Sequence, residues 1–105
     1  MKHIAVVTTV GGLAEAQSMA RALVERKLAA CAHISPIESF YTWNNAVQNA
    51  TEFRVLFKTT RQRYPAVEAA ILERHSYELP AIYAVALDPV YAPYAAWLET
   101  NSAGS

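Results

Sequence analysis

The stretch from Leu28 to Trp43 restricts the fold more than any other part of this sequence. It predicts a long extended segment, and the residues from Ile37 to Trp43 alternate between two faces as strand residues do. Pro36 cannot donate to a strand ladder, so we expect an edge, a bulge or a bend there. A polar connection over residues 44–49 leads to a second extended run, Thr51 to Thr60. The two runs predict a projecting hairpin, too long for one small domain to cover.

The length and composition predict one domain whose surface meets another subunit. The chain has 105 residues, which fits a single domain over residues 1–105. Apolar residues make up 53% and charged residues only 17%, so a small interior leaves apolar side chains uncovered. Nine basic and nine acidic residues cancel, and no long basic run is present, which argues against a nucleic-acid partner.

The N-terminal segment and the single cysteine indicate a cytoplasmic protein. The first residues lack the length and cleavage pattern of a secretory signal. No apolar stretch approaches the ~20 residues that span a membrane, so we expect no membrane partner. Cys31 is the only cysteine, and a disulfide within the chain is therefore impossible.

The remaining segments alternate between strand and helix patterns. Runs rich in β-branched residues predict strands, and apolar residues at helical spacing predict helices. The predicted elements beside the hairpin are a strand at Ile4–Val10, helices near 13–27 and 62–74, a strand at Ala81–Leu87 and a helix at Val90–Thr100. This β-α-β-β-α-β order predicts an α+β fold of the ferredoxin-like class with an extra C-terminal helix.

Three finer expectations follow from that fold. Both main helices should cover one face of the sheet, and self-association is the natural way to cover the other. Arg26 and Lys27 are expected in the last turn of the first helix, where positive charge suits the helix dipole. The tail over residues 101–105 is expected to fray.

An ordered set of short motifs gives the sequence a family resemblance. The motifs are Leu28-Ala29-Ala30-Cys31, Tyr41-x-Trp43, Glu52, Lys58-Thr59-Thr60, His75-x-Tyr77-x-x-Pro80, and Tyr94 with Trp97. In this order, over nearly the whole chain, the set resembles the CutA divalent-cation tolerance family. The resemblance implies a ferredoxin-like homotrimer similar to the PII signalling proteins, whose ligands sit in clefts between subunits. It also implies tolerance to copper and other divalent metals without an enzymatic activity.

Two departures from the family pattern predict weak metal binding. Some members have a thiol in the first strand, where this chain has Thr8 or Thr9. Some have a pair of histidines where this chain has Arg74 and His75. Both changes remove soft or borderline ligands, so we expect copper or zinc to bind weakly, if a divalent metal binds at all.

The candidate metal ligands are His75, Glu52 and Cys31. His75 is a borderline base that suits copper or zinc, although it could instead cap the second helix through that helix's last carbonyls. Cys31 could bind metal as a thiolate, although a lone cysteine beside alanines is more often a small core residue. His3 and His33 are expected to be structural or solvated.

A second set of residues suits a small ligand in a cleft between subunits. Lys58 could approach a ligand anion, and Tyr77, Tyr94 and Trp97 could line the pocket. The plainer alternatives are that Glu52 and Lys58 pair with charges on neighbouring strands, and that the aromatic side chains form an oligomer interface. The sequence thus supports two functions: a metal-responsive tolerance protein and, as the alternative, a PII-like sensor or scaffold with an unknown protein partner. It contains no triad, phosphate loop, CxxC pair or HExxH motif, and Gly11-Gly12 is expected to be a plain turn.

Overall fold

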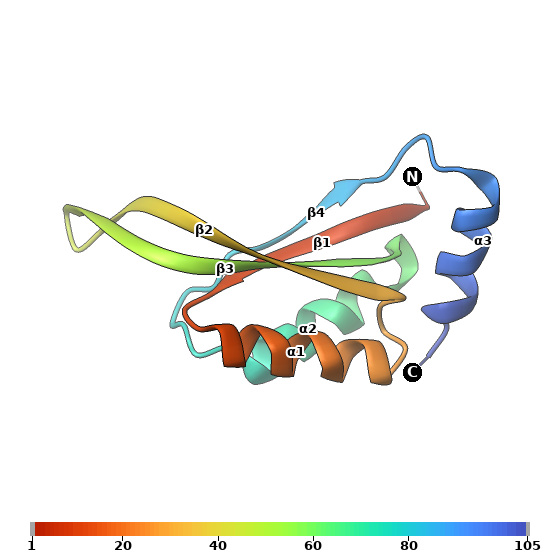
Figure 1. The fold of residues 1–105 in the computed structure, drawn as a ribbon, viewed down its shortest axis with the longest axis horizontal. Helices are drawn as coiled ribbons and strands as arrows, with labels where there is room; N and C mark the ends of the chain where they lie inside the picture. The colour runs from red at the N-terminus through yellow and green to blue at the C-terminus, as the bar shows by residue number, and fades with distance from the viewer. Residues whose placement is uncertain (1, 105) are drawn as a thin grey trace.

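The computed structural model describes residues 2–104 and has the predicted order of elements (Figure 1). The elements are β1 (His3–Val10), α1 (Leu13–Glu25), β2 (Cys31–Trp43), β3 (Ala46–Thr60), the short 3-10 helix η1 (Arg61–Arg63), α2 (Tyr64–Arg74), β4 (Ile82–Ala86) and α3 (Ala92–Asn101). The predicted α+β class and the ferredoxin-like order are confirmed.

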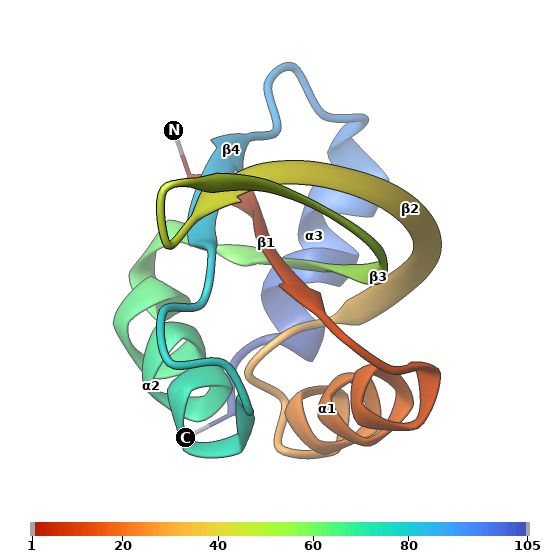
Figure 2. The same ribbon diagram turned by 90° about the vertical axis from the view of Figure 1, so that its left-hand side faces the viewer.

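The four strands form one antiparallel sheet in the order β2-β3-β1-β4. Helices α1 and α2 lie side by side on one face of this sheet, as predicted (Figure 2). Alternate residues of the central strands point toward the helices, because successive strand residues face opposite sides. Val6 of β1 and Phe57 of β3 are fully buried there, together with Leu23 of α1 and Ile71 of α2.

The hairpin is longer and its turn tighter than the sequence predicted. Only Asn44 and Asn45 form the turn, with φ values of 52° and 61°. Asparagine tolerates this left-handed backbone, and a two-residue turn of this kind matches the twist of the strands it joins. Residues 46–50 therefore belong to β3, and the predicted polar connection over residues 44–49 is wrong. Pro36 lies in edge strand β2 and pairs with Phe53 without a bulge.

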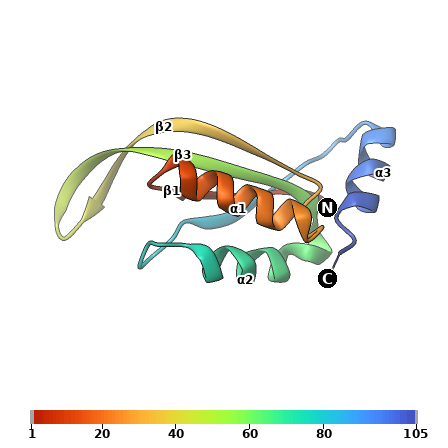
Figure 3. The same ribbon diagram turned by 60° about the horizontal axis from the view of Figure 1, so that its bottom comes forward.

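Half of the hairpin has no third strand beside it. Strand β1 pairs with β3 only from Thr60 back to Phe53, so beyond that point β2 and β3 pair only with each other. This part extends past the ends of α1 and α2 (Figure 3), and it gives the molecule its longest dimension of 45 Å. The predicted projection of the hairpin is confirmed.

The ends of two helices differ from the sequence prediction. Helix α1 stops at Glu25 because Lys27 adopts a left-handed φ of 57°, so no basic residue lies in its last turn. The tail does not fray over the described residues. Ser102 is buried, and the backbone N–H of Gly104 donates to the Lys27 carbonyl at 3.0 Å. No side chain would fit at Gly104, because a Cβ there would collide with the carbonyl of Arg26.

Candidate functional site

The predicted site residues lie in two groups at different ends of the sheet. Cys31 is paired directly with Lys58 across β2 and β3, and Tyr94 and Trp97 of α3 lie beside them. Glu52 lies six residues before Lys58 on β3, which is about 20 Å along an extended strand. His75 and Tyr77 belong to the Glu52 end. Within one chain, therefore, Cys31 cannot bind the same metal ion as His75 and Glu52. Nor can Tyr77 line one ligand pocket together with Lys58, Tyr94 and Trp97.

Both ring nitrogens of His75 are engaged in hydrogen bonds. Nε2 lies 2.9 Å from the carbonyl oxygen of Thr9 and 3.1 Å from Oγ1 of Thr8. Nδ1 accepts a hydrogen bond from the backbone N–H of Tyr77 at 3.1 Å. A carbonyl can only accept, so Nε2 carries the proton and the ring is the neutral tautomer. The His75 side chain bonds to β1 rather than to the end of α2. The lone pair on Nδ1, which a metal ion would need, already accepts the N–H of Tyr77.

Tyr77 connects this segment to β3. Its hydroxyl donates to Oε2 of Glu52 at 2.6 Å, and the Glu52 side chain is buried on the sheet face away from α1 and α2. Burial raises the pKa of Tyr77 well above its ordinary value, and the hydrogen bond to the Glu52 carboxylate raises it further. A Cβ at Gly11 would approach the Tyr77 hydroxyl to 3.3 Å, so this glycine leaves room for the contact in addition to forming a turn.

Glu15 holds the same segment from the α1 side. Its two carboxylate oxygens accept from the backbone N–H and from Oγ of Ser76, both at 3.1 Å. The segment 75–77 is thus tied to β1, β3 and α1 at once. Glu15 and Thr8 could not be recognised from the sequence as partners of this segment, because they lie more than 60 residues before Ser76 and His75 and only the fold brings them together.

A groove lies between this segment and the projecting hairpin. It has a volume of about 840 Å³ and is lined mainly by the hairpin from Glu38 to Trp43 and by residues 76–79, with Ala81 and Tyr83 of the β4 region. Its surface combines aromatic and aliphatic side chains with the carboxylates of Glu38, Glu52 and Glu78. Tyr41 and Trp43, at the end of the hairpin, are in this groove and remain exposed.

The second group surrounds the Tyr94 ring. Lys58 Nζ donates to the Tyr94 hydroxyl at 3.4 Å and lies 5.4 Å from the ring centroid, while Cys31 Sγ lies 3.7 Å from the hydroxyl. The Trp97 ring stacks on Tyr94 with centroids 5.6 Å apart. Burial raises the pKa of Tyr94, and the thiol contact adds to this while Lys58 opposes it. Cys31 is therefore a partly exposed member of a polar cluster and not a residue of the main core.

Neither group forms a ready-made metal centre. Within residues 2–104, no three side chains of His, Cys, Asp or Glu lie close enough together to hold one ion. His3 and Glu99 form a pair, with Nε2 2.8 Å from Oε2, and His33 is exposed on β2. Over the described residues, a single chain therefore offers a divalent cation no more than two such side chains at one place.

Comparison with known proteins identifies the family. The model of the CutA1 divalent ion tolerance protein family matches residues 4–101, which is nearly the whole chain. This chain belongs to the CutA1 family. The divalent-cation tolerance protein CutA of Archaeoglobus fulgidus is 34% identical over 97 residues, which cover 92% of this chain and 95% of that protein. The CutA protein of Thermus thermophilus is 35% identical, with 92% and 95% covered.

Solved CutA structures have the same fold. The Archaeoglobus fulgidus structure superposes with a TM-score of 0.93 at 33% identity and covers 95% of this chain and 98% of that one. The structure of CutA from Synechococcus elongatus also gives 0.93, at 34% identity, with 97% and 91% covered. The Archaeoglobus protein is described as periplasmic. None of the helices in residues 2–104 of this chain has the length and apolar character to cross a membrane.

Proposed function

We propose that this CutA1-family chain is a homotrimeric, non-enzymatic tolerance protein of the cytoplasm that binds divalent copper or zinc weakly. Family membership supports the link to divalent cations. The scattered ligands of the single chain support weak binding, because tight sites for such metals gather three or four donors.

The proposed assembly follows from what the sheet leaves uncovered. Strands β2 and β4 are the two edges of the sheet, and edge strands offer unpaired backbone groups to other chains. Phe40 and Val47 on the projecting hairpin and Tyr83 on β4 are exposed. A second copy that packs on the hairpin and the groove beside it would cover these side chains, and closed symmetry would satisfy every copy in the same way. Trp43→Asp at the hairpin tip should loosen this assembly before it disturbs the fold of one chain.

The metal is proposed to act at the His75 and Glu52 end of the sheet. An ion that binds His75 Nδ1 must displace the N–H of Tyr77, and one that binds Glu52 must compete with the Tyr77 hydroxyl. Both competitions lower the net affinity. The same geometry predicts that binding loosens the segment 75–77.

Calorimetric titration of the metal-free protein with Cu²⁺ and Zn²⁺ tests this site. His75→Ala should weaken the affinity at least tenfold, on the order of 1.4 kcal/mol. His33→Ala is the matched control, because it removes an exposed histidine from β2 and should leave the affinity unchanged. Equal affinities of wild type and His75→Ala would move the site elsewhere, and a submicromolar site at His75 would contradict weak binding.

A second function, a PII-like ligand sensor, is favoured by the Lys58, Tyr94 and Trp97 cluster. A cation beside two stacked rings suits an anionic ligand with an aromatic group. In this proposal the ligand lies between subunits, where Tyr77 of a neighbouring copy could join the three. Titration with a panel of nucleotides in the absence of metal separates the two functions. The sensor function requires saturable nucleotide binding that Lys58→Ala weakens. The metal function requires no nucleotide binding.

A further inference from the structure

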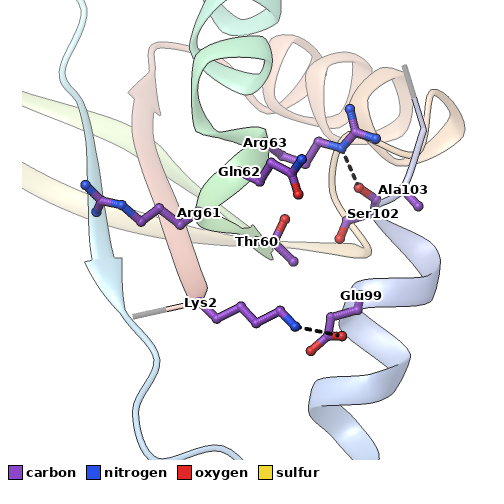
Figure 4. Close-up of a pocket in the computed structure, with 8 residues that line it drawn as sticks. All are labelled: Lys2, Thr60, Arg61, Gln62, Arg63, Glu99, Ser102 and Ala103. Carbon is purple, nitrogen blue, oxygen red and sulfur yellow. Dashed lines mark hydrogen bonds and ion pairs between the residues drawn. The ribbon is translucent and has the colours of Figure 1, made fainter.

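A cavity at the end of the sheet opposite the hairpin tip lies outside both groups described above (Figure 4). It has a volume of about 710 Å³ and forms where the start of β1, the η1 segment and the end of α3 meet. The lining residues are Lys2, Thr60, Arg61, Gln62, Arg63, Glu99, Ser102 and Ala103.

The charges around this cavity are strongly unequal. Lys2, Arg61 and Arg63 are cationic, and Glu99 is the only carboxylate that residues 2–104 contribute to the lining. Oε1 of Glu99 lies 3.3 Å from Lys2 Nζ, and its Oε2 lies 2.8 Å from Nε2 of His3. Within residues 2–104, one carboxylate shared in this way offsets only part of the positive charge of the cavity, in a chain whose total charge is balanced.

Lys2, Arg61 and Arg63 have side-chain N–H groups that could bind a ligand. Arg63 Nε donates to the carbonyl of Ser102 at 2.9 Å, and no residue from 2 to 104 bonds to the two terminal nitrogens of its guanidinium. The side chain of Arg61 makes no hydrogen bond or ion pair with any other residue from 2 to 104. Lys2 is exposed, and an exposed ion pair such as that with Glu99 is weak enough to rearrange.

Neutral donors complete the lining. The Thr60 hydroxyl and the Gln62 amide lie between the Lys2–Glu99 pair and Arg63 (Figure 4). Thr60 precedes η1, and its side chain does not cap that helix, so the hydroxyl is available to a ligand. Figure 4 shows the Arg61 and Arg63 guanidinium groups pointing away from each other and Lys2 directed at Glu99, so a ligand would draw the ends of these long side chains toward the Thr60 and Gln62 donors. Guanidinium and ammonium groups, with such neutral donors, match the oxygens of a phosphate group.

From these observations we propose that this cavity binds a small phosphate-bearing anion, of the size of a diphosphate or a phosphate ester. The volume lies within the roughly 300–1,000 Å³ of small-molecule sites and exceeds what one phosphate fills. The proposal rests on the cavity of a single chain and requires neither a bound metal nor the trimer.

Titration of the metal-free protein with pyrophosphate at constant ionic strength tests this site. The expected result is saturable binding, with amide NMR shifts gathered at residues 60–63 and 102–103. Lys2→Ser/Arg61→Ser should weaken this binding at least tenfold, about 1.4 kcal/mol. Inorganic phosphate should bind to the same residues more weakly, because it reaches fewer of the donors.

A matched control separates a site from general charge attraction. Arg21→Ser/Arg74→Ser removes the same charge from exposed helix positions and should leave the affinity within about twofold. Absence of binding up to about 10 mM pyrophosphate would overturn the proposal. Equal losses of pyrophosphate affinity in the two double variants would overturn it as well. So would amide NMR shifts spread over the whole surface.

Discussion

The helix-covered half of the sheet and the projecting half of the hairpin are built from the same two strands, β2 and β3. In the covered half, Val55 and Phe57 are fully buried beneath α1 and α2. In the projecting half, Phe40 is 66% exposed and Val47 75% exposed. Large apolar side chains occur in both halves, so the difference in their exposure lies in what packs beside them. The chain covers one face of the first half by itself, and in the proposed trimer other copies would cover the second half.

Energetics support the same division. A two-stranded ribbon is marginal in water, whereas a sheet packed on helices is stable. Burial of apolar surface contributes roughly 25 cal/mol per Å², so the exposed hairpin side chains have much to gain from a partner surface.

The largest difference is expected between Phe57→Ala and Phe40→Ala. Phe57→Ala should lower the free energy of unfolding by about 3–5 kcal/mol at every protein concentration, because it opens a cavity in the core of one chain. Phe40→Ala should lower the apparent stability by an amount that depends on protein concentration, because the Phe40 side chain would contribute to stability through association of the chains. Thermal unfolding at several protein concentrations measures both. A concentration-independent cost of similar size for Phe40→Ala would erase the distinction between the halves.

The covered half was largely predictable from the sequence, and the site was not. Strand and helix periodicity depends on neighbouring residues, so Ile4–Val10 and the first helix were predicted within a few residues. The turn was missed because its asparagines were read with the polar residues 48 and 49, although only φ values at Asn44 and Asn45 define it. His75 was singled out as a candidate metal ligand, which stays a prediction. Its hydrogen-bond partners Thr8 and Thr9 come from the first strand, and no local pattern indicates such a contact.

An intermediate effect is expected for Tyr77→Phe, at the segment that adjoins both halves. The change removes the hydroxyl that donates to the buried Glu52 carboxylate and should cost about 1–3 kcal/mol at neutral pH. Leu79→Ala is a nearby exposed control that should cost much less.

The pH dependence of Tyr77 has a definite sign. Its pKa is raised in the fold, so folding favours the protonated hydroxyl. This contribution is fully present below the ordinary value of 10.0 and is lost as the pH rises above it. Denaturant unfolding between pH 9 and pH 11, roughly the range around an ordinary tyrosine, should show a steeper loss for wild type than for Tyr77→Phe. Parallel curves would contradict the assigned contact.

The smallest effect is expected at the hairpin turn. Asn45→Gly should stabilise the hairpin by about 0.5–1 kcal/mol, since glycine adopts a positive φ without the steric cost of a Cβ. Asn45→Val at the same position should destabilise by a similar or larger amount. Hydrogen exchange of the amides in residues 46–50 measures the change locally, and protection that is equal in both variants would show that the turn does not limit the hairpin.

The central claim is that the projecting half of the hairpin is completed by other copies of the chain. Sedimentation equilibrium of the wild-type protein at micromolar concentration tests it most directly. We expect one species with three times the chain mass of 11.6 kDa. A species of one chain mass that persists as the protein is concentrated would contradict it.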